Sequence, residues 1–188
     1  MKVKVIIAST RPGRRGPTLA RWIVKILQEE ADLDVALIDL KEVNLPFLDE
    51  AAHPRLRKYE KKHTIKWSAE IDDADAYVMV TPEYNHVAPP TLLNAINFLH
   101  QEWAEKPVGF VSYGGVSGGT RAVESLIPVV TALSMMPIPQ AVNVPFFASH
   151  IDPEGRFLPG EIQNKAAKNM VTHLKRWAKA LKIMRIEH

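Results

Sequence analysis

The sequence predicts an α/β protein built on a doubly wound, five-stranded parallel sheet with helices on both faces. Short apolar runs rich in β-branched residues alternate along the chain with longer segments of helical periodicity. The apolar runs are nearly continuous, as expected for parallel strands that are buried on both faces. Because crossovers between parallel strands are right-handed, this alternation favours the strand order 2-1-3-4-5.

Five apolar runs define the predicted strands, which are residues 3–8, 35–40, 76–81, 108–113 and 141–144. Between them, apolar side chains recur every three or four positions, and this spacing predicts helices. The apolar stripes begin at Leu19, Leu92, Val123 and Ile162. Pro128 falls within the third stripe, so we expect it to kink that helix or to mark one of its ends.

Composition limits the possible classes of protein. The 188 residues are 46% hydrophobic and 24% charged, which fits a single domain over residues 1–188. The absence of cysteine excludes thiolate nucleophiles and zinc–thiolate sites and is compatible with a cytoplasmic protein. No apolar run is long enough to cross a membrane. A net charge of +3 without clustered aromatic residues argues against nucleic acid, and the seven histidines lack metal-ligand spacing, so no metal is expected.

The turn after the first strand carries the strongest functional signal. Residues 9–18 read Ser-Thr-Arg-Pro-Gly-Arg-Arg-Gly-Pro-Thr and open a helix. Backbone N–H groups and the positive end of a helix dipole point outward from such a turn. Three guanidinium groups beside that dipole require an anion, which predicts a phosphate site; the alternative is a solvated surface turn. A Walker motif and a GxGxxG motif are both missing, which argues against a P-loop or a dinucleotide site.

Two further loops are unusual, and the predicted strand order brings all three to one edge of the sheet. Residues 82–90 form a proline-stiffened segment in which Tyr84 offers a stacking face and Asn85 a donor and an acceptor, although its last two prolines are also compatible with a simple helix start. Residues 112–119 contain four glycines, which allow the backbone to lie against a ligand. Together the three loops describe a pocket for flavin mononucleotide (FMN).

The residues of these loops resemble those of the NADPH-dependent FMN reductase family, a flavodoxin-like branch that includes quinone, azo-dye and chromate reductases. Segments 9–14, 81–85, 93–96, 106–107 and 112–115 carry the resemblance, over about the first two thirds of the chain. By position, it implies that the FMN phosphate is held by Ser9, Arg11, Arg14, Gly16, Pro17 and Thr18. It implies that the isoalloxazine ring contacts Pro82, Glu83, Tyr84, Asn85, His86, Ser112, Tyr113, Gly114, Gly115, Ser117 and Gly118.

The resemblance also implies a ping-pong cycle. NADPH, with NADH as a possible substitute, passes a hydride to FMN and leaves before a quinone, azo compound, flavin or similar acceptor takes the electrons. Because the flavin carries the chemistry, we predict no catalytic side chain. Backbone N–H groups of the glycine loop are expected to stabilise negative charge on the reduced ring, and we expect the carboxylate of Glu83 to point away from it. A homodimer or tetramer is implied by the same resemblance.

Two other functions use the same residues. A flavin-binding electron carrier, or a redox sensor for a protein partner, is the principal alternative. Carriers of this fold dock through acidic surfaces, whereas this chain has a net charge of +3, which favours the enzyme. A polyanion-binding protein that uses the same arginines is the third possibility.

Overall fold

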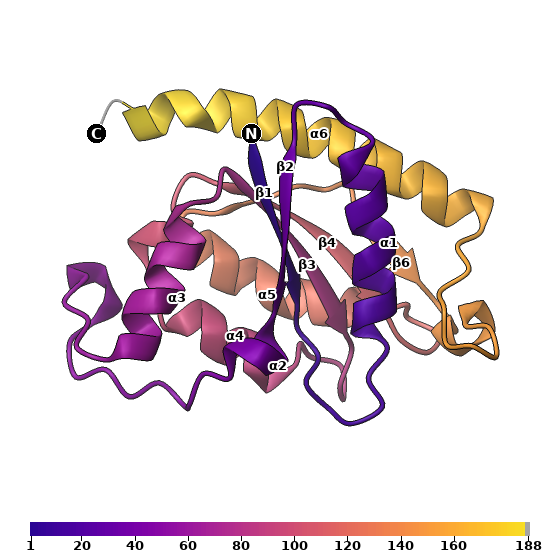
Figure 1. Ribbon diagram of the computed structural model, residues 1–188, viewed down its shortest axis with the longest axis horizontal. Coiled ribbons are helices and arrows are strands. Elements are labelled where there is room, and N and C mark those ends of the chain that lie inside the picture. Colours follow the sequence, from indigo (N-terminus) through magenta and orange to yellow (C-terminus); the bar gives the residue numbers. More distant parts are fainter. Residues whose placement is uncertain (187–188) are drawn as a thin grey trace.

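The computed structural model describes residues 1–186 and contains the predicted parallel sheet (Figure 1). Its long strands are β1 (Lys2–Ile7), β2 (Asp34–Asp39), β3 (Ala76–Pro82) and β4 (Pro107–Tyr113). They stand in the order β2-β1-β3-β4, and each neighbouring pair is parallel. The predicted doubly wound, flavodoxin-like order is confirmed for these four strands.

The fifth position of the sheet is divided between two short strands. Both β5 (Met136–Pro137) and β6 (Val142–Val144) pair with β4 in parallel, β5 near its start and β6 near its end. The sequence predicted only the second of them. Met136 N and Ile138 N donate to Lys106 O and Val108 O, and pairing with β4 resumes only at Val142. The nitrogens of Pro137 and Pro139, which carry no N–H group, alternate to the outer edge of the sheet, where proline is tolerated.

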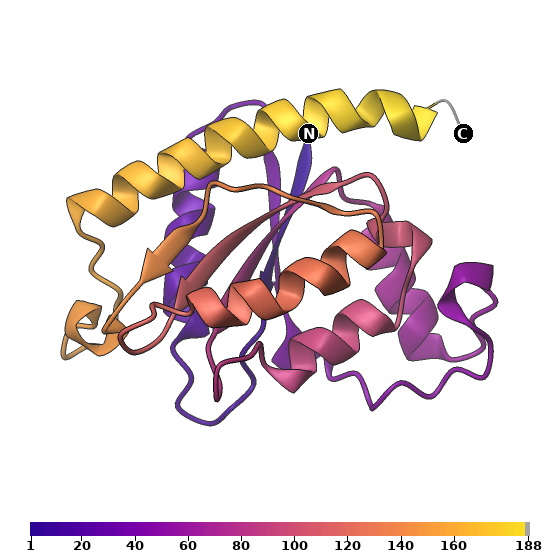
Figure 2. The same ribbon diagram turned by 180° about the vertical axis from the view of Figure 1, so that it is seen from behind.

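The helices form a layer on each face of the sheet. One face is covered by α1 (Gly16–Gln28) and α6 (Glu161–Ile186), and the other by α3 (Lys62–Asp72), α4 (Pro90–Asn97) and α5 (Thr120–Ala132) (Figures 1 and 2). A short helix, α2 (Leu40–Val43), follows β2 directly. Single 3-10 turns occupy Pro54–Leu56, Gln101–Trp103 and Phe147–His150.

Successive side chains of each strand point to opposite faces of the sheet, so they form two separate hydrophobic cores. Val78 of β3 packs towards α1 and α6, whereas its neighbour Met79 packs towards the other three helices. Both side chains are fully buried. Burial of each such side chain contributes about 1.5–3 kcal/mol, so this pattern fixes which face each strand residue occupies.

Pro128 lies inside α5, which runs from Thr120 to Ala132 without ending at the proline. Of the two predicted alternatives, the one in which Pro128 marks an end of the helix is therefore wrong, and a kink at Pro128 stays a prediction. Pro128 is exposed on the solvent side of α5, where water can bond to the carbonyl group that loses its helical donor.

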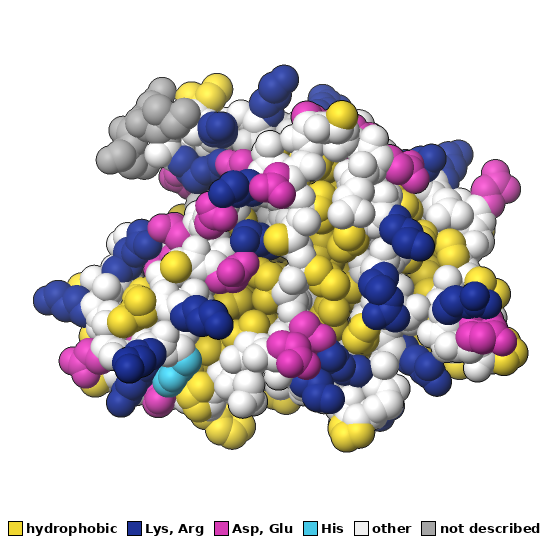
Figure 3. Space-filling view, viewed as in Figure 1, with side chains coloured by type: hydrophobic (Ala, Val, Ile, Leu, Met, Phe, Trp, Pro, Cys, Tyr) yellow, Lys and Arg dark blue, Asp and Glu magenta, His cyan; other side chains and the backbone are white. Residues whose placement is uncertain are grey.

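Strand β2 forms one edge of the sheet, and β5 and β6 form the other. Figure 3 shows hydrophobic side chains gathered on this face of the molecule, between the regions of α1 and α3, and Leu37 of β2 is 45% exposed. No helix within residues 1–186 is both long and apolar enough to cross a bilayer.

The packing of the glycine turn before α5 against the end of β4 can be tested by substitution. Gly119 has a φ of +84°, and a Cβ there would lie 2.7 Å from Tyr113 N. We predict that Gly119→Ala lowers the free energy of unfolding by about 2–4 kcal/mol, because strain and overlap add. Gly115→Ala is the control, since a Cβ at Gly115 meets nothing within 4 Å. Equal urea midpoints for the two variants would contradict this account.

Candidate functional site

A cavity of about 560 Å³ opens at the carboxyl edge of the sheet, where the loops after β1, β3, β4 and β6 meet. Its size is typical of small-molecule sites. The loop after β1 contributes Arg11, Gly13, Arg14 and Arg15. The other loops contribute Pro82, Glu83, Tyr84, Tyr113, Gly114, Gly115, Phe146, Phe147, Ala148 and Ser149.

The three arginines of the first loop differ in their partners. Arg14 is half-buried and makes a bidentate ion pair with Asp39 at 2.5 Å, and it also donates to Ser9 O at 2.7 Å. The hydrogen bonds to Asp39 raise the pKa of Arg14 above its ordinary value. Arg11 and Arg15 have no carboxylate partner in the described chain, so their charges remain available to a ligand.

The first loop also keeps unused donors. The backbone N–H of Arg14 donates to Arg11 O at 3.2 Å, and that of Thr18 donates to Arg15 O at 3.1 Å. Within residues 1–186, the backbone N–H groups of Gly13, Arg15 and Gly16 donate to no protein acceptor. Free N–H groups at the start of a helix form an anion site, so this loop is suited to a phosphate.

Close packing explains the glycine at the start of α1. A Cβ at Gly16 would lie 2.4 Å from Ser9 Oγ and 3.1 Å from the hydroxyl of Tyr113. Ser9 is fully buried, and its hydroxyl has no partner of normal geometry in the described structure, although Tyr113 is close by. Burial raises the pKa of Tyr113 to about 12, so its phenol stays protonated near neutral pH.

The loop after β3 is folded into a tight turn. Tyr84 and Val87 pair through two backbone hydrogen bonds of 3.0 and 3.1 Å. Asn85 and His86 form the tip with φ values of 49° and 70°, a conformation that side chains other than glycine rarely adopt. The guanidinium of Arg11 lies 6.0 Å from the centre of the Tyr84 ring, within range of a cation–π contact.

The carboxylate of Glu83 is turned towards the start of α5. It accepts hydrogen bonds from Ser117 Oγ at 2.8 Å and from the backbone N–H of Arg121 at 3.2 Å. Burial acts to raise the pKa of Glu83, but the hydrogen bonds from Ser117 and Arg121 outweigh it, and the pKa lies below its ordinary value. Glu83 is therefore ionised near neutral pH.

The glycine loop after β4 has a structural half and a cavity half. Ser112 is buried and its hydroxyl lies 2.8 Å from both Gly118 O and Asn143 Oδ1. A Cβ at Gly118 would lie 2.9 Å from Pro145 N, so this glycine is required for packing. The cavity is lined instead by Gly114 and Gly115.

The loop after β6 forms a wall that the sequence analysis did not predict. Phe146 N donates to Gly115 O at 2.8 Å, and Phe147 N donates to Gly114 O at 3.1 Å, so this loop is fastened to the glycine loop. Phe146 is 61% exposed and has a φ of 45°. The signal that could have found it is topological, because a fifth parallel strand also ends at the carboxyl edge.

The structure brings eight of the predicted site residues to the cavity, which are Arg11, Arg14, Pro82, Glu83, Tyr84, Tyr113, Gly114 and Gly115. The others lie next to it but do not line it: Ser9, Gly16, Pro17, Thr18, Asn85, His86, Ser112, Ser117 and Gly118. Thr18 accepts a hydrogen bond from Phe157 N at 2.9 Å through its hydroxyl, which ties α1 to the segment before α6.

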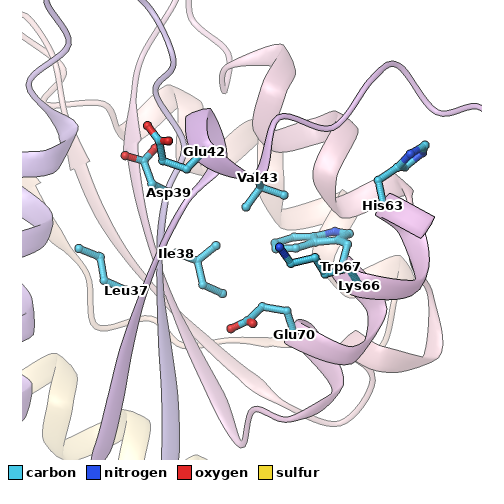
Figure 4. A pocket seen from close by; sticks show the side chains of 9 residues that line it. All are labelled: Leu37, Ile38, Asp39, Glu42, Val43, His63, Lys66, Trp67 and Glu70. Atoms are coloured by element: carbon cyan, nitrogen blue, oxygen red, sulfur yellow. The ribbon is translucent and has the colours of Figure 1, made fainter. Parts of the chain in front are cut away.

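A second cavity of about 310 Å³ lies between β2, α2 and α3 (Figure 4). Three of its titratable groups are paired: Asp39 with Arg14, Glu70 with Lys4, and His63 with Asp49. Glu42 and Lys66 also line the cavity and make no ion pair within the described residues. Figure 4 shows Asp39 and His63 on opposite sides of the cavity. These groups do not converge on a reacting atom, and no three metal-ligating side chains cluster anywhere in residues 1–186.

Comparison with known proteins agrees with this geometry. Residues 1–149 match the model of the family described as NADPH-dependent FMN reductase. An NAD(P)H-dependent FMN reductase of Schizosaccharomyces pombe is 39% identical over 120 residues, which cover 63% of this chain and 60% of that protein. A quinone reductase of Escherichia coli is 30% identical over 173 residues, which cover 88% of this chain and 80% of that protein.

A solved structure supports the fold independently. FerB, a flavoenzyme NAD(P)H:(acceptor) oxidoreductase from Paracoccus denitrificans, superposes with a TM-score of 0.68 at 21% identity, over 96% of this chain and 97% of its own. Fold and site thus define a flavodoxin-like protein whose first turn is suited to an anion. The chain belongs to the NADPH-dependent FMN reductase family. The predicted resemblance is confirmed, as is the class of enzyme, with FMN as cofactor and NAD(P)H as donor.

The contribution of the Arg14–Asp39 ion pair at the cavity can be measured by protein stability. We predict that Arg14→Met lowers the free energy of unfolding by roughly 1.5–3 kcal/mol, because Asp39 and Ser9 O lose a charged donor. Lys2→Met is the matched control, since it removes the exposed pair with Asp73. Urea unfolding should show a clearly larger loss for Arg14→Met. An equal loss in both variants would mean that the half-buried pair contributes no more than a surface pair.

Proposed function

We propose that this protein transfers reducing equivalents from NADPH to a small-molecule acceptor, such as a quinone, an azo compound or a free flavin, with FMN held in the 560 Å³ cavity. The observation that carries this proposal is the convergence of unpaired arginines, an aromatic ring and a glycine wall on that single cavity. The name of the Escherichia coli relative supports a quinone as acceptor.

The first loop fits the phosphate of FMN. Among the residues that the structure describes, Arg11 and Arg15 have no carboxylate partner and the N–H groups of Gly13 and Gly16 have no acceptor, so they supply charge and donors to a ligand. Arg14 also lines the cavity, and its pair with Asp39 and its bond to Ser9 O hold the loop in shape. The phosphate therefore meets a preorganised site and need not reorder the chain.

The remaining loops fit the ring of FMN, which when bound supplies the hydride chemistry. Tyr84 offers a flat face on one side, and Gly114 and Gly115 allow close approach of backbone on the other. Backbone N–H groups would hold the ring and stabilise negative charge, as in an oxyanion site. No acidic or basic side chain is needed as a catalyst, because Glu83 is held by Ser117 and Arg121.

We further propose that donor and acceptor use this cavity in turn, as a ping-pong cycle requires. A homodimer or tetramer and a cytoplasmic location also remain proposals; a sequence without cysteine is compatible with the latter. Gel filtration and cell fractionation test these two points directly.

If Arg11 binds the phosphate of FMN, Arg11→Ala should lower the affinity for FMN and leave the affinity for riboflavin unchanged. We expect FMN binding by the apoprotein to weaken by roughly 1.5–3 kcal/mol, the contribution of a charge-assisted hydrogen bond. Riboflavin, which lacks the phosphate, should bind as it does to the wild type. Arg21→Ala, an exposed change on α1, is the control. Unchanged FMN affinity, measured by quenching of flavin fluorescence, would exclude Arg11 from the phosphate site.

The function is tested by the visible spectrum of the protein after it is mixed with excess FMN and freed of unbound flavin. We expect a retained flavin spectrum that bleaches under anaerobic NADPH. In the steady state, with a simple quinone as acceptor, the protein should oxidise NADPH at least as fast as it oxidises NADH. A protein that retains flavin but needs a separate reductase for turnover is an electron carrier, and that result would overturn the proposed enzyme.

A further inference from the structure

Two helices, α1 and α5, begin at the edge of the cavity. In each, the residue before the first turn, Arg15 or Gly119, makes no side-chain capping hydrogen bond, and the first turn contains no acidic residue. Neither helix start is therefore capped from within its own segment, and the helix dipole makes both positive. Two equivalent ends would offer an anionic ligand two competing positions.

The start of α5 receives a carboxylate from another loop. Glu83 Oε2 lies 2.8 Å from Ser117 Oγ and 3.2 Å from the backbone nitrogen of Arg121, both of which donate to it. Its second oxygen, Oε1, lies 3.3 Å from Arg121 Nη1 in an ion pair. The start of α1 is different, because Arg11 and Arg15 beside it have no carboxylate partner in the described chain. An internal anion thus occupies one helix start and leaves the other for a ligand.

Glu83 also joins the two walls of the cavity. Its backbone belongs to the wall after β3, next to Tyr84, whereas Ser117 belongs to the glycine loop. The side chain of Glu83 is only 9% exposed. A Cβ at Gly114 would lie 3.6 Å from Glu83 Cβ, so the side chain packs directly against the opposite wall. The backbone hydrogen bond from Glu83 N to Tyr113 O (3.2 Å) joins the two walls where the strands end, and the carboxylate of Glu83 with its donors joins them again beyond that point.

We propose that Glu83 is a positioning residue, which caps α5 across the loops and thereby sets the distance between the two walls that hold the flavin ring. This inference rests on the proposed function, because it gives Glu83 a role in that same site. Glu83 acts through Ser117 and Arg121, and its carboxylate does not contact the ring.

The test is the binding of FMN and of riboflavin to the apoprotein of Glu83→Gln, measured by quenching of flavin fluorescence. Glutamine keeps the shape of the side chain but removes the charge that pairs with Arg121. We expect both flavins to bind about tenfold more weakly, with the ratio of their dissociation constants unchanged, because ring walls act on both ligands alike. Arg11→Ala should change that ratio, so the ratio distinguishes a residue that positions the ring walls from a residue that binds the phosphate.

Two further variants make the result decisive. Ser117→Ala removes the neutral donor of the same contact, so it should weaken the binding of both flavins several-fold. In the double variant with Glu83→Gln, this loss of affinity should not add to the loss caused by Glu83→Gln. This variant also carries the test if Glu83→Gln fails to fold. Glu124→Gln, an exposed change on α5, should bind both flavins as the wild type does.

The outcomes distinguish this inference from the proposed function. If the wild type binds flavin and Glu83→Gln binds both flavins equally well, the positioning role is wrong and the proposed function stands. A loss confined to FMN also overturns the positioning role, because it assigns Glu83 to the phosphate. If the wild type binds neither flavin, the proposed function falls, and the role of Glu83 in that site falls with it.

Discussion

Parallel pairing of strands that are buried on both faces is the constraint on which the rest of this structure depends. Because every strand from β1 to β4 runs in the same direction between two layers of helices, each loop that follows a strand must open at one edge. The cavity therefore collects residues that are more than 130 positions apart in the chain, from Arg11 to Ser149. Each element contributes a rigid end to the site, and the hydrophobic cores hold those ends in place.

Ion pairing, and not the number of charged residues, determines which charges in the cavity are available to a ligand. Arg14 is neutralised by Asp39 and Arg121 by Glu83, so these two cations support loops. Within residues 1–186, Arg11 and Arg15 have no carboxylate partner. An anionic ligand would then be drawn to the start of α1, where the helix dipole and the free N–H groups act in the same direction. In the proposed function, this division favours the start of α1 as the position of the FMN phosphate.

The loops that form the cavity are stiff, and their stiffness suits a site in which the cofactor carries the chemistry. Asn85, His86 and Phe146 all hold left-handed backbone conformations, and each belongs to a loop closed by backbone hydrogen bonds. Such conformations persist only where the surroundings enforce them. A protein that must place a flat ring with backbone groups gains from this rigidity, because little ordering is left to occur on binding.

The sequence by itself determined the class of fold, the four long strands, the three loops of the site and the family, because these depend on local periodicity, on glycine and on clustered charge. It did not determine the division of the fifth strand or the wall of Phe146 to Ser149, since that loop carries no charge or glycine pattern. Tertiary structure alone decided which arginines are free and that Ser112, Gly118 and Thr18 serve packing. The physical reason is that pairing and burial depend on residues that are distant in the chain. Asp39 reaches Arg14, and Phe157 reaches Thr18, only when the chain folds.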